Sequence, residues 1–201
     1  MKFRLMAVLI IGGIALTLFG GRGIFVMMTP AVDLYAEDCN WENLHANQRV
    51  ETNIDFVLDH FYAFKDDASE LYMFPDLKFY DDGAQIEHYM AVVVSQSDYE
   101  QFDRLVEDSW AWWDGESDTL AAGGTIPRSG YLRKMNKDER EELTKILKDY
   151  DYTDEMIEKV VVPYVFMKSQ TPISNIISLA GGLLMLVAGI AFLVFGIIRR
   201  K

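Results

Sequence analysis

The sequence predicts an α+β domain inserted between two transmembrane helices. Two long apolar stretches lie near the ends of the chain, and the segment between them alternates strand-like and helix-like patterns. The expected order is three strands, a helix, a strand, a helix and a last strand. This order fits a small OB-like β-barrel or an α+β sandwich with two helices, and neither architecture implies a function.

The C-terminal apolar stretch covers residues 173–198, which are twenty-six residues without a charge. As a helix it would reach about 39 Å at ~1.5 Å per residue, which exceeds the ~30 Å hydrocarbon core of a bilayer. The stretch is therefore predicted to be a transmembrane helix, followed by a basic tail at 199–201.

The N-terminal apolar stretch, residues 5–28, follows Lys2 and Arg4 and is predicted to be a second transmembrane helix. A basic start before an apolar run also fits a cleaved signal peptide. The nearest candidate cleavage site, residues 29–31, contains a proline and fits poorly. A retained helix is therefore favoured, and cleavage stays open as the alternative.

The distribution of charge predicts the orientation. Segment 30–172 carries thirteen basic and thirty-one acidic residues, a net charge of −18, whereas the six basic residues outside it are unopposed. Positive flanks favour the cytoplasm, so residues 1–4 and 199–201 are expected there, with domain 29–172 on the extracytoplasmic side of the plasma membrane. An acidic domain is repelled by phosphates, which argues against nucleic acid as a partner.

Glycines recur at seven-residue spacing in both apolar stretches. Gly13 and Gly20 lie in the first, and Gly182, Gly189 and Gly196 lie in the second. Each set makes a smooth stripe that lets another helix backbone approach closely. The two stripes are predicted to face each other in a hairpin, and a homo-oligomer or another membrane protein is the alternative partner.

Alternating apolar and polar residues predict the strands of the domain. Pro75 is expected to end the second strand, and Gly123-Gly124 to form a bulge or a close backbone approach. The last strand is expected at a sheet edge because it contains Pro163. The predicted strands are 50–58 (continuing with a bend through 61–64), 71–74, 86–95, 119–127 and 161–167.

Two helices are predicted inside the domain. The first begins at Ser97, with Glu100 at the capping-box spacing, and ends before Gly115. The second covers 137–150 with Asn136 as its cap, and Thr153 is expected to cap a further turn. Residues expected on the inner face of the first helix are Tyr99, Phe102, Val106, Trp110 and Trp113, which leaves Trp112 as the candidate exposed tryptophan.

No catalytic, cofactor-binding or metal-ligating residues are predicted. His45, His60 and His88 lack a metal-ligand spacing, and Cys39 has no second cysteine to pair with. Gly123-Gly124 lacks the remaining residues of a phosphate-binding loop. The expectation is a protein without a cofactor that is not an enzyme.

Calcium is the one ligand that the acidic residues suggest. One cluster joins residues 81–83 to Glu87, and a second comprises Asp149, Asp151, Asp154 and Glu155. Neither matches the twelve-residue calcium loop. A hairpin turn and an acidic linker are the simpler interpretations.

Five segments between the two apolar stretches carry a family resemblance: Val50–Phe56, Leu71–Pro75, Ser97–Trp113, Gly124-Thr125-Ile126 and Val162-Pro163-Tyr164. With these segments the chain resembles a set of uncharacterised two-span membrane proteins of Gram-positive bacteria. The resemblance implies no activity and transfers no site residue.

The sequence therefore favours a membrane protein that displays an acidic domain at the cell envelope, with a structural or protein-interaction role. The alternatives are a ligand sensor or accessory subunit of a membrane complex, and a surface hydrolase. The lipid bilayer is the expected partner in each case.

Overall fold

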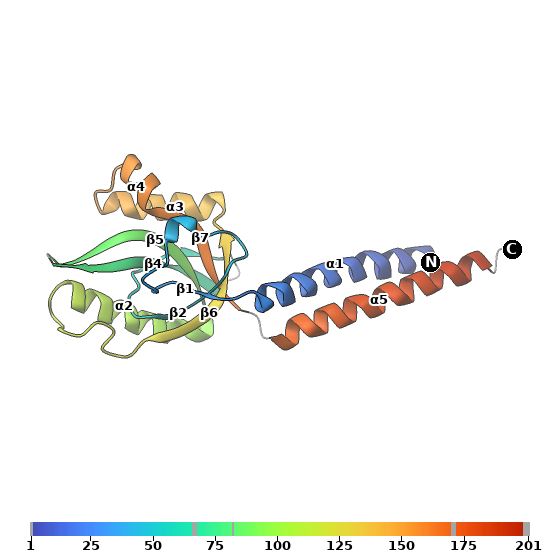
Figure 1. Ribbon diagram of the computed structural model, residues 1–201. Coiled ribbons are helices and arrows are strands. Elements are labelled where there is room, and N and C mark those ends of the chain that lie inside the picture. The colour runs from blue at the N-terminus through green and yellow to red at the C-terminus, as the bar shows by residue number, and fades with distance from the viewer. Residues whose placement is uncertain (1, 66–67, 82, 170–171, 199–201) are drawn as a thin grey trace. The chain divides into compact units, whose positions relative to one another are not determined.

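The computed structural model describes residues 2–65, 68–81, 83–169 and 172–198 (Figure 1). The chain divides into two compact units. One unit is Ala31–Ser169, and the other combines the terminal segments Met1–Pro30 and Gln170–Lys201.

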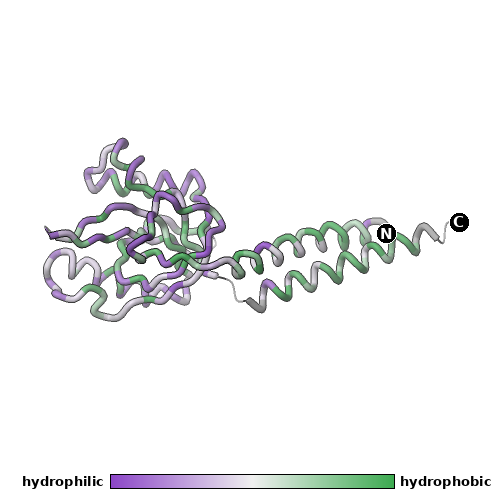
Figure 2. The backbone as a smooth tube through the Cα atoms, viewed as in Figure 1, coloured by the Kyte–Doolittle hydropathy of each residue, from purple (hydrophilic) through white to green (hydrophobic). Residues whose placement is uncertain are grey.

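The terminal unit consists of two long helices, α1 (Lys2–Met28) and α5 (Pro172–Ile198), which pack against each other. Each contains a window, Arg4–Val26 and Ser174–Phe195, that is long and apolar enough to cross a membrane. Figure 2 shows hydrophobic residues along most of both helices. The prediction of two long apolar helices is confirmed, and their composition is compatible with a two-span membrane protein.

The other unit is built on one seven-stranded mixed sheet with the strand order β1-β2-β6-β7-β5-β4-β3. The pairs β1–β2 and β5–β7 are parallel, and the other neighbouring strands are antiparallel. The strands are β1 (Val32–Asp33), β2 (Arg49–Ile54), β3 (His60–Ala63), β4 (Ser69–Tyr80), β5 (Gly83–Ser95), β6 (Ile126–Lys134) and β7 (Val161–Lys168).

Three α-helices and two short 3-10 helices complete this unit. The α-helices are α2 (Tyr99–Trp113), α3 (Lys137–Asp149) and α4 (Asp154–Val160), and the 3-10 helices are η1 (Trp41–Asn43) and η2 (Gln96–Asp98). Figure 1 shows α3 and α4 over one face of the sheet and α2 over the other. The α+β class is confirmed. The barrel is wrong, because β1 and β3 are opposite edges of an open sheet in the described chain.

Alternation along β4 and β5 divides the core into two clusters, one on each face. Tyr72, Phe74 and Met90 belong to the cluster that packs against η1 and the first half of α2. Leu71 and Met73 belong to the cluster under α3 and α4. Because β5 and β4 are buried on both faces, they read as continuous apolar runs at their centres.

Pro75 lies inside a strand, contrary to prediction, whereas Pro163 lies in the last strand as predicted; that strand is interior and not at a sheet edge. β4 continues through Pro75, which pairs with Tyr89 of β5, while the partner strand on the other side, β3, pairs only as far as Tyr72. Pro75 thus lies beyond the end of the β3 pairing, where the lack of an amide on that side of β4 breaks no ladder hydrogen bond with β3. Pro163 lies in the interior strand β7, at a point where the register with β5 shifts and the β-ladder is interrupted.

Helix α2 begins two residues later than predicted, and its inner face is rotated. Ser97 lies in η2 and donates to Asp98 Oδ1 rather than capping α2, so the predicted capping box is wrong. Leu105 and Ser109 are buried beside Phe102, whereas Trp113 is exposed. The predicted caps Asn136 and Thr153 are confirmed, because both side chains accept backbone amides of their helices.

The glycines before β6 lie in a turn and not in a strand. β6 begins at Ile126, and Gly124 has a φ of +100°, a conformation that favours glycine. The close backbone approach occurs at Gly130 instead, where an added Cβ would overlap the carbonyl oxygen of Met167 on β7.

Candidate functional site

A β-bulge in the β4–β5 hairpin creates the most concentrated group of ligand-type side chains among the described residues. Asp76 pairs with His88, and the next residue, Leu77, pairs with Ile86, so Glu87 is the extra residue of β5. Consecutive strand residues normally point to opposite faces, but a bulge redirects one of them. The bulge therefore lets Glu87 and His88 share one face of the sheet with Asp76.

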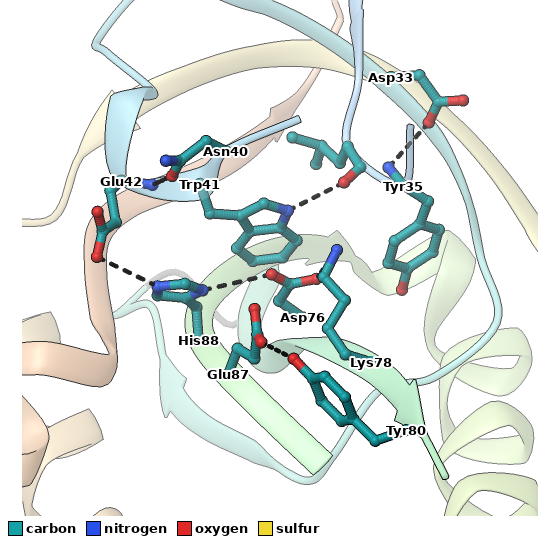
Figure 3. Close-up of polar contacts among 11 residues, drawn as sticks. Asp33, Tyr35, Asn40, Trp41, Glu42, Asp76, Lys78, Tyr80, Glu87 and His88 are labelled. Atoms are coloured by element: carbon teal, nitrogen blue, oxygen red, sulfur yellow. Dashed lines mark hydrogen bonds and ion pairs between the residues drawn. The ribbon is translucent and has the colours of Figure 1, made fainter. Parts of the chain in front are cut away.

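These side chains converge. Ligand atoms of Asp76, Glu87 and His88 all lie within 4.8 Å of one another. Asp76 Oδ2 is 3.3 Å from His88 Nδ1, and Asp76 Oδ1 is 3.1 Å from Lys78 Nζ (Figure 3). We call Asp76, Lys78, Glu87 and His88 the Asp76 cluster.

Helix η1 covers the imidazole of this cluster. The Trp41 ring stacks on His88 with centroids 6.5 Å apart and an interplanar angle of 19°. Trp41 Nε1 donates to the carbonyl oxygen of Leu34 at 3.0 Å, which fixes the indole, and the Asn40 side chain caps η1 by accepting the amide of Glu42. Glu42 then places a carboxylate oxygen 4.0 Å from His88 Nε2 (Figure 3).

Two tyrosines border the Asp76 cluster. The Tyr80 hydroxyl donates to Glu87 Oε1, which holds that carboxylate near the hairpin tip. Tyr35 packs on Phe74 with centroids 5.9 Å apart. Burial, followed by the charges of Asp55 and Asp76, raises the pKa of Tyr35 well above its usual value, so its phenol is neutral at physiological pH.

Burial and charge together make the site electronegative. Asp76 is only 2% exposed, and burying a carboxylate is costly unless it is paired or binds a cation. Lys78 supplies one positive charge, against the carboxylates of Asp76, Glu87 and Glu42. The arrangement suits binding of a cation better than binding of an anion.

A nucleophilic role for Cys39 is not supported. Burial and the charge of Asp76 raise the pKa of the Cys39 thiol, and the opposing effect of Lys78 is smaller. The thiolate is the reactive form, so Cys39 is mainly an unreactive thiol at neutral pH. Its side chain packs against the core cluster that contains Trp41.

Sequence reasoning missed the Asp76 cluster because its members come from two strands and a bulge. The spacing of His88 to the other histidines gives no metal-ligand pattern, and no motif in the sequence includes Asp76. The predicted long strand over 86–95 does pair with β4, but no pattern in the sequence marks Glu87 as the extra residue. The sequence does contain ligand-type residues at these places: Glu87 and His88 are consecutive, and Asp76 precedes them on the neighbouring strand.

Among the described residues, neither acidic cluster suggested for calcium brings three carboxylates within ligand distance of one another. Asp82 lies outside the described residues, and Glu87 belongs to the Asp76 cluster. In the second cluster, Asp154 pairs with Lys148 at 2.6 Å and Glu155 pairs with Lys159 at 3.1 Å.

An open groove of about 450 Å³ lies beside the hairpin tip, lined by Phe79, Tyr80, Gly83, Ala84, Trp112 and Trp113. Trp112 is half-buried, and Trp113 is the more exposed of the two. The Trp112 ring makes angles of 70° with Phe79 and 58° with Trp113. The tilted rings do not form the flat platform on which a sugar ring would stack.

Four of the five glycines singled out from sequence lie between α1 and α5. An added Cβ would come within 2.9 Å of Gly182 O at Gly13, and within 2.5 Å of Leu179 N at Gly20. At Gly182 the nearest atom would be Thr17 N at 2.6 Å. At Gly189 it would be Ile10 Cγ1 at 2.7 Å; the surroundings of Gly196 lie outside the described residues.

The fold and the site define a class of protein: an α+β domain with a buried carboxylate–imidazole cluster, joined to a pair of long apolar helices. The chain belongs to the family described as domain of unknown function DUF8577, whose model matches residues 1–198. No curated protein and no solved structure matches the chain.

Proposed function

We propose that the protein is a two-span membrane protein that displays its 31–169 unit outside the cell and acts there through protein contacts. Both termini are then cytoplasmic, and the resemblance noted above implies the envelope of a Gram-positive bacterium. The observation that carries the proposal is the pair of long apolar helices flanking one folded unit.

The packing of α1 and α5 supports a membrane environment. Close backbone approach at glycines is the usual way in which helices associate in lipid. Large apolar side chains such as Leu18 and Leu184 point away from the partner helix and are about 70% exposed (69% and 71%). Soluble surfaces rarely expose such continuous apolar area, whereas hydrocarbon would solvate it.

The proposed orientation rests on the positive charges outside segment 30–172 and on its net charge of −18. A membrane-impermeant maleimide tests it in intact cells. In a Cys39→Ser background, exposed Glu116→Cys is expected to react, and Lys2→Cys is expected to react only after the membrane is opened. If only Lys2→Cys reacted in intact cells, the orientation would be the opposite of the one proposed.

A ligand sensor is the second candidate, and the Asp76 cluster favours it. His88 of the cluster contacts Trp41 and Glu42 of η1, which lies between α1 and β2 in the chain, so a ligand there would act on the segment that connects a membrane helix to the sheet. Crosslinking in cells followed by purification separates the candidates. A stoichiometric transporter or kinase subunit would favour the sensor, and a structural envelope protein would favour the first proposal.

A surface hydrolase has less support. Asp76 could orient His88 as a base, but the thiol close to this pair, Cys39, has a raised pKa. The Asp76–His88 pair by itself does not define a hydrolytic site, which also needs a nucleophile that the base can activate.

A further inference from the structure

We propose that Asp76, Glu87 and His88 form a binding site for a divalent transition metal of the zinc class. The proposal goes beyond the membrane-display function and is independent of it. Two carboxylates and one imidazole are a ligand set that zinc and its neighbours accept in proteins.

The distances fit such an ion. Asp76 Oδ2 and His88 Nδ1 are 3.3 Å apart. Two ligand atoms at about 2.05 Å from one zinc ion are separated by that distance when the ligand–metal–ligand angle is about 107°, close to tetrahedral. The Glu87 carboxylate already lies within 4.8 Å of both, and a rotation of its side chain away from the Tyr80 hydroxyl would complete a three-ligand face.

Asp76 provides a second, independent indication. Its side chain is 3% exposed, and its Oδ1 atom accepts no hydrogen bond among the described residues, although Lys78 Nζ lies 3.1 Å away. Buried carboxylate oxygens are normally hydrogen-bonded or bound to a cation. A metal ion bound near Lys78 Nζ would therefore satisfy Asp76 Oδ1 better than the ammonium group does.

The surroundings of His88 suit a metal ligand. Nδ1 faces Asp76, while Nε2 faces Glu42 Oε1 at 4.0 Å (Figure 3). Metal-binding histidines usually direct the second ring nitrogen to a carboxylate, which fixes the tautomer. Trp41 stacks on the ring and limits its rotation. Glu42 is a positioning residue in this arrangement because it would not touch the metal.

Replacing Lys78 is expected to strengthen metal binding, an effect that a loss of folding cannot produce. Its ammonium competes with a metal for Asp76, and its side chain is 31% exposed, so it can move away. Lys78→Gln removes the competitor and is expected to raise metal affinity roughly two- to fivefold, the range of a partly exposed ion pair. An unfolded variant would bind more weakly.

The test is calorimetric titration of the full-length protein in detergent, without an affinity tag and after chelation, with Zn²⁺ as the probe. Wild type is expected to bind one Zn²⁺. His88→Gln and Glu87→Gln are each expected to bind at least about tenfold more weakly, the lower end for lost ligand interactions. His45→Gln and His60→Gln, which alter exposed histidines outside the cluster, are expected to match wild type.

The proposal would be overturned by the absence of saturable Zn²⁺ binding by wild type, or by equal affinity of wild type and His88→Gln. Weaker rather than tighter binding by Lys78→Gln in a folded protein would overturn it as well. Loss of binding in His45→Gln or His60→Gln alone would also reject the site. Circular dichroism of each variant establishes that it is folded.

Discussion

Arg133 donates hydrogen bonds from both terminal guanidinium nitrogens to Glu139, at 2.8 Å to Oε2 and 2.6 Å to Oε1. The Glu139 side chain is fully buried and also accepts the amide of Asn136, whose own side chain accepts the amide of Glu139. One carboxylate thus joins the end of β6 to the first turn of α3. Such a bidentate, charge-assisted pair is among the stronger polar interactions in proteins.

We predict that Glu139→Gln lowers the free energy of unfolding by about 3 kcal/mol, because it breaks an ion pair whose carboxylate is fully buried. Chemical denaturation of the full-length protein, followed by circular dichroism, measures the change. Glu141→Gln is the control, since the Glu141 side chain is 63% exposed and pairs with Lys137 on the surface. Equal stability of the two variants would contradict the prediction.

We predict a pH-dependent contribution from Asp98. Burial alone would raise its pKa, but hydrogen bonds from Lys168 and Ser97 and the charges of Lys168 and Arg128 together lower it. A carboxyl group with a lowered folded pKa stabilises the protein above its unfolded pKa, about 3.9 for aspartate, and loses that effect as the pH falls through the folded value.

Asp98→Asn is therefore expected to lower the free energy of unfolding at pH 7 by on the order of 1 kcal/mol. The variant should then unfold at a lower temperature than wild type. The difference should shrink as the pH drops below about 4. Thermal melts of both proteins across this range measure it. A difference that stays constant with pH would show that the carboxylate charge of Asp98 is not the cause.

We predict that Gly182→Leu separates α1 from α5, whereas the adjacent Gly181→Leu does not. A Cβ at Gly182 would lie 2.6 Å from Thr17 N, while a Cβ at Gly181 meets nothing within 4 Å. Both variants add the same apolar surface, so membrane insertion should be unchanged in each.

Thiol crosslinking of cysteines placed at Gly12 and Met185, in a Cys39→Ser background, reports the pairing of the helices. An added Cβ at Gly12 lies 3.0 Å from the end of the Met185 side chain, so the two positions are neighbours. The expected result is a strong loss of crosslinking for Gly182→Leu only. Equal crosslinking in both variants would mean that the glycines are not required for pairing.

We predict that Ser109→Ala lowers the free energy of unfolding by about 1–3 kcal/mol, the cost of leaving a buried donor unpaired. Ser109 is fully buried on α2, where its hydroxyl accepts the amide of Val57 at 3.1 Å and donates to Leu105 O at 2.7 Å. The contact joins α2 to the segment between β2 and β3. Ser129→Ala, at an exposed position of β6, serves as the control in the same denaturation assay and should have little effect.

Prediction from sequence succeeded where the determinants are local. Asn136 and Thr153 cap their helices through hydrogen bonds to amides three residues ahead, and β7 begins at Val161 as expected. It failed for α2, where local spacing allowed two inner faces differing by a small rotation. Contacts with distant residues, such as Ser109 with Val57, select the observed face.

The two long apolar helices, the α+β class and the caps of α3 and α4 follow from the sequence alone, since each depends on composition or on neighbours within a few residues. The place of β7 between β5 and β6, and the open edges of the sheet, depend on pairing between strands that are distant in the chain. The convergence of Asp76, Glu87 and His88 depends on such pairing as well. A one-residue bulge at Glu87 changes which face a side chain occupies, and its placement depends on pairing between two strands rather than on either strand alone.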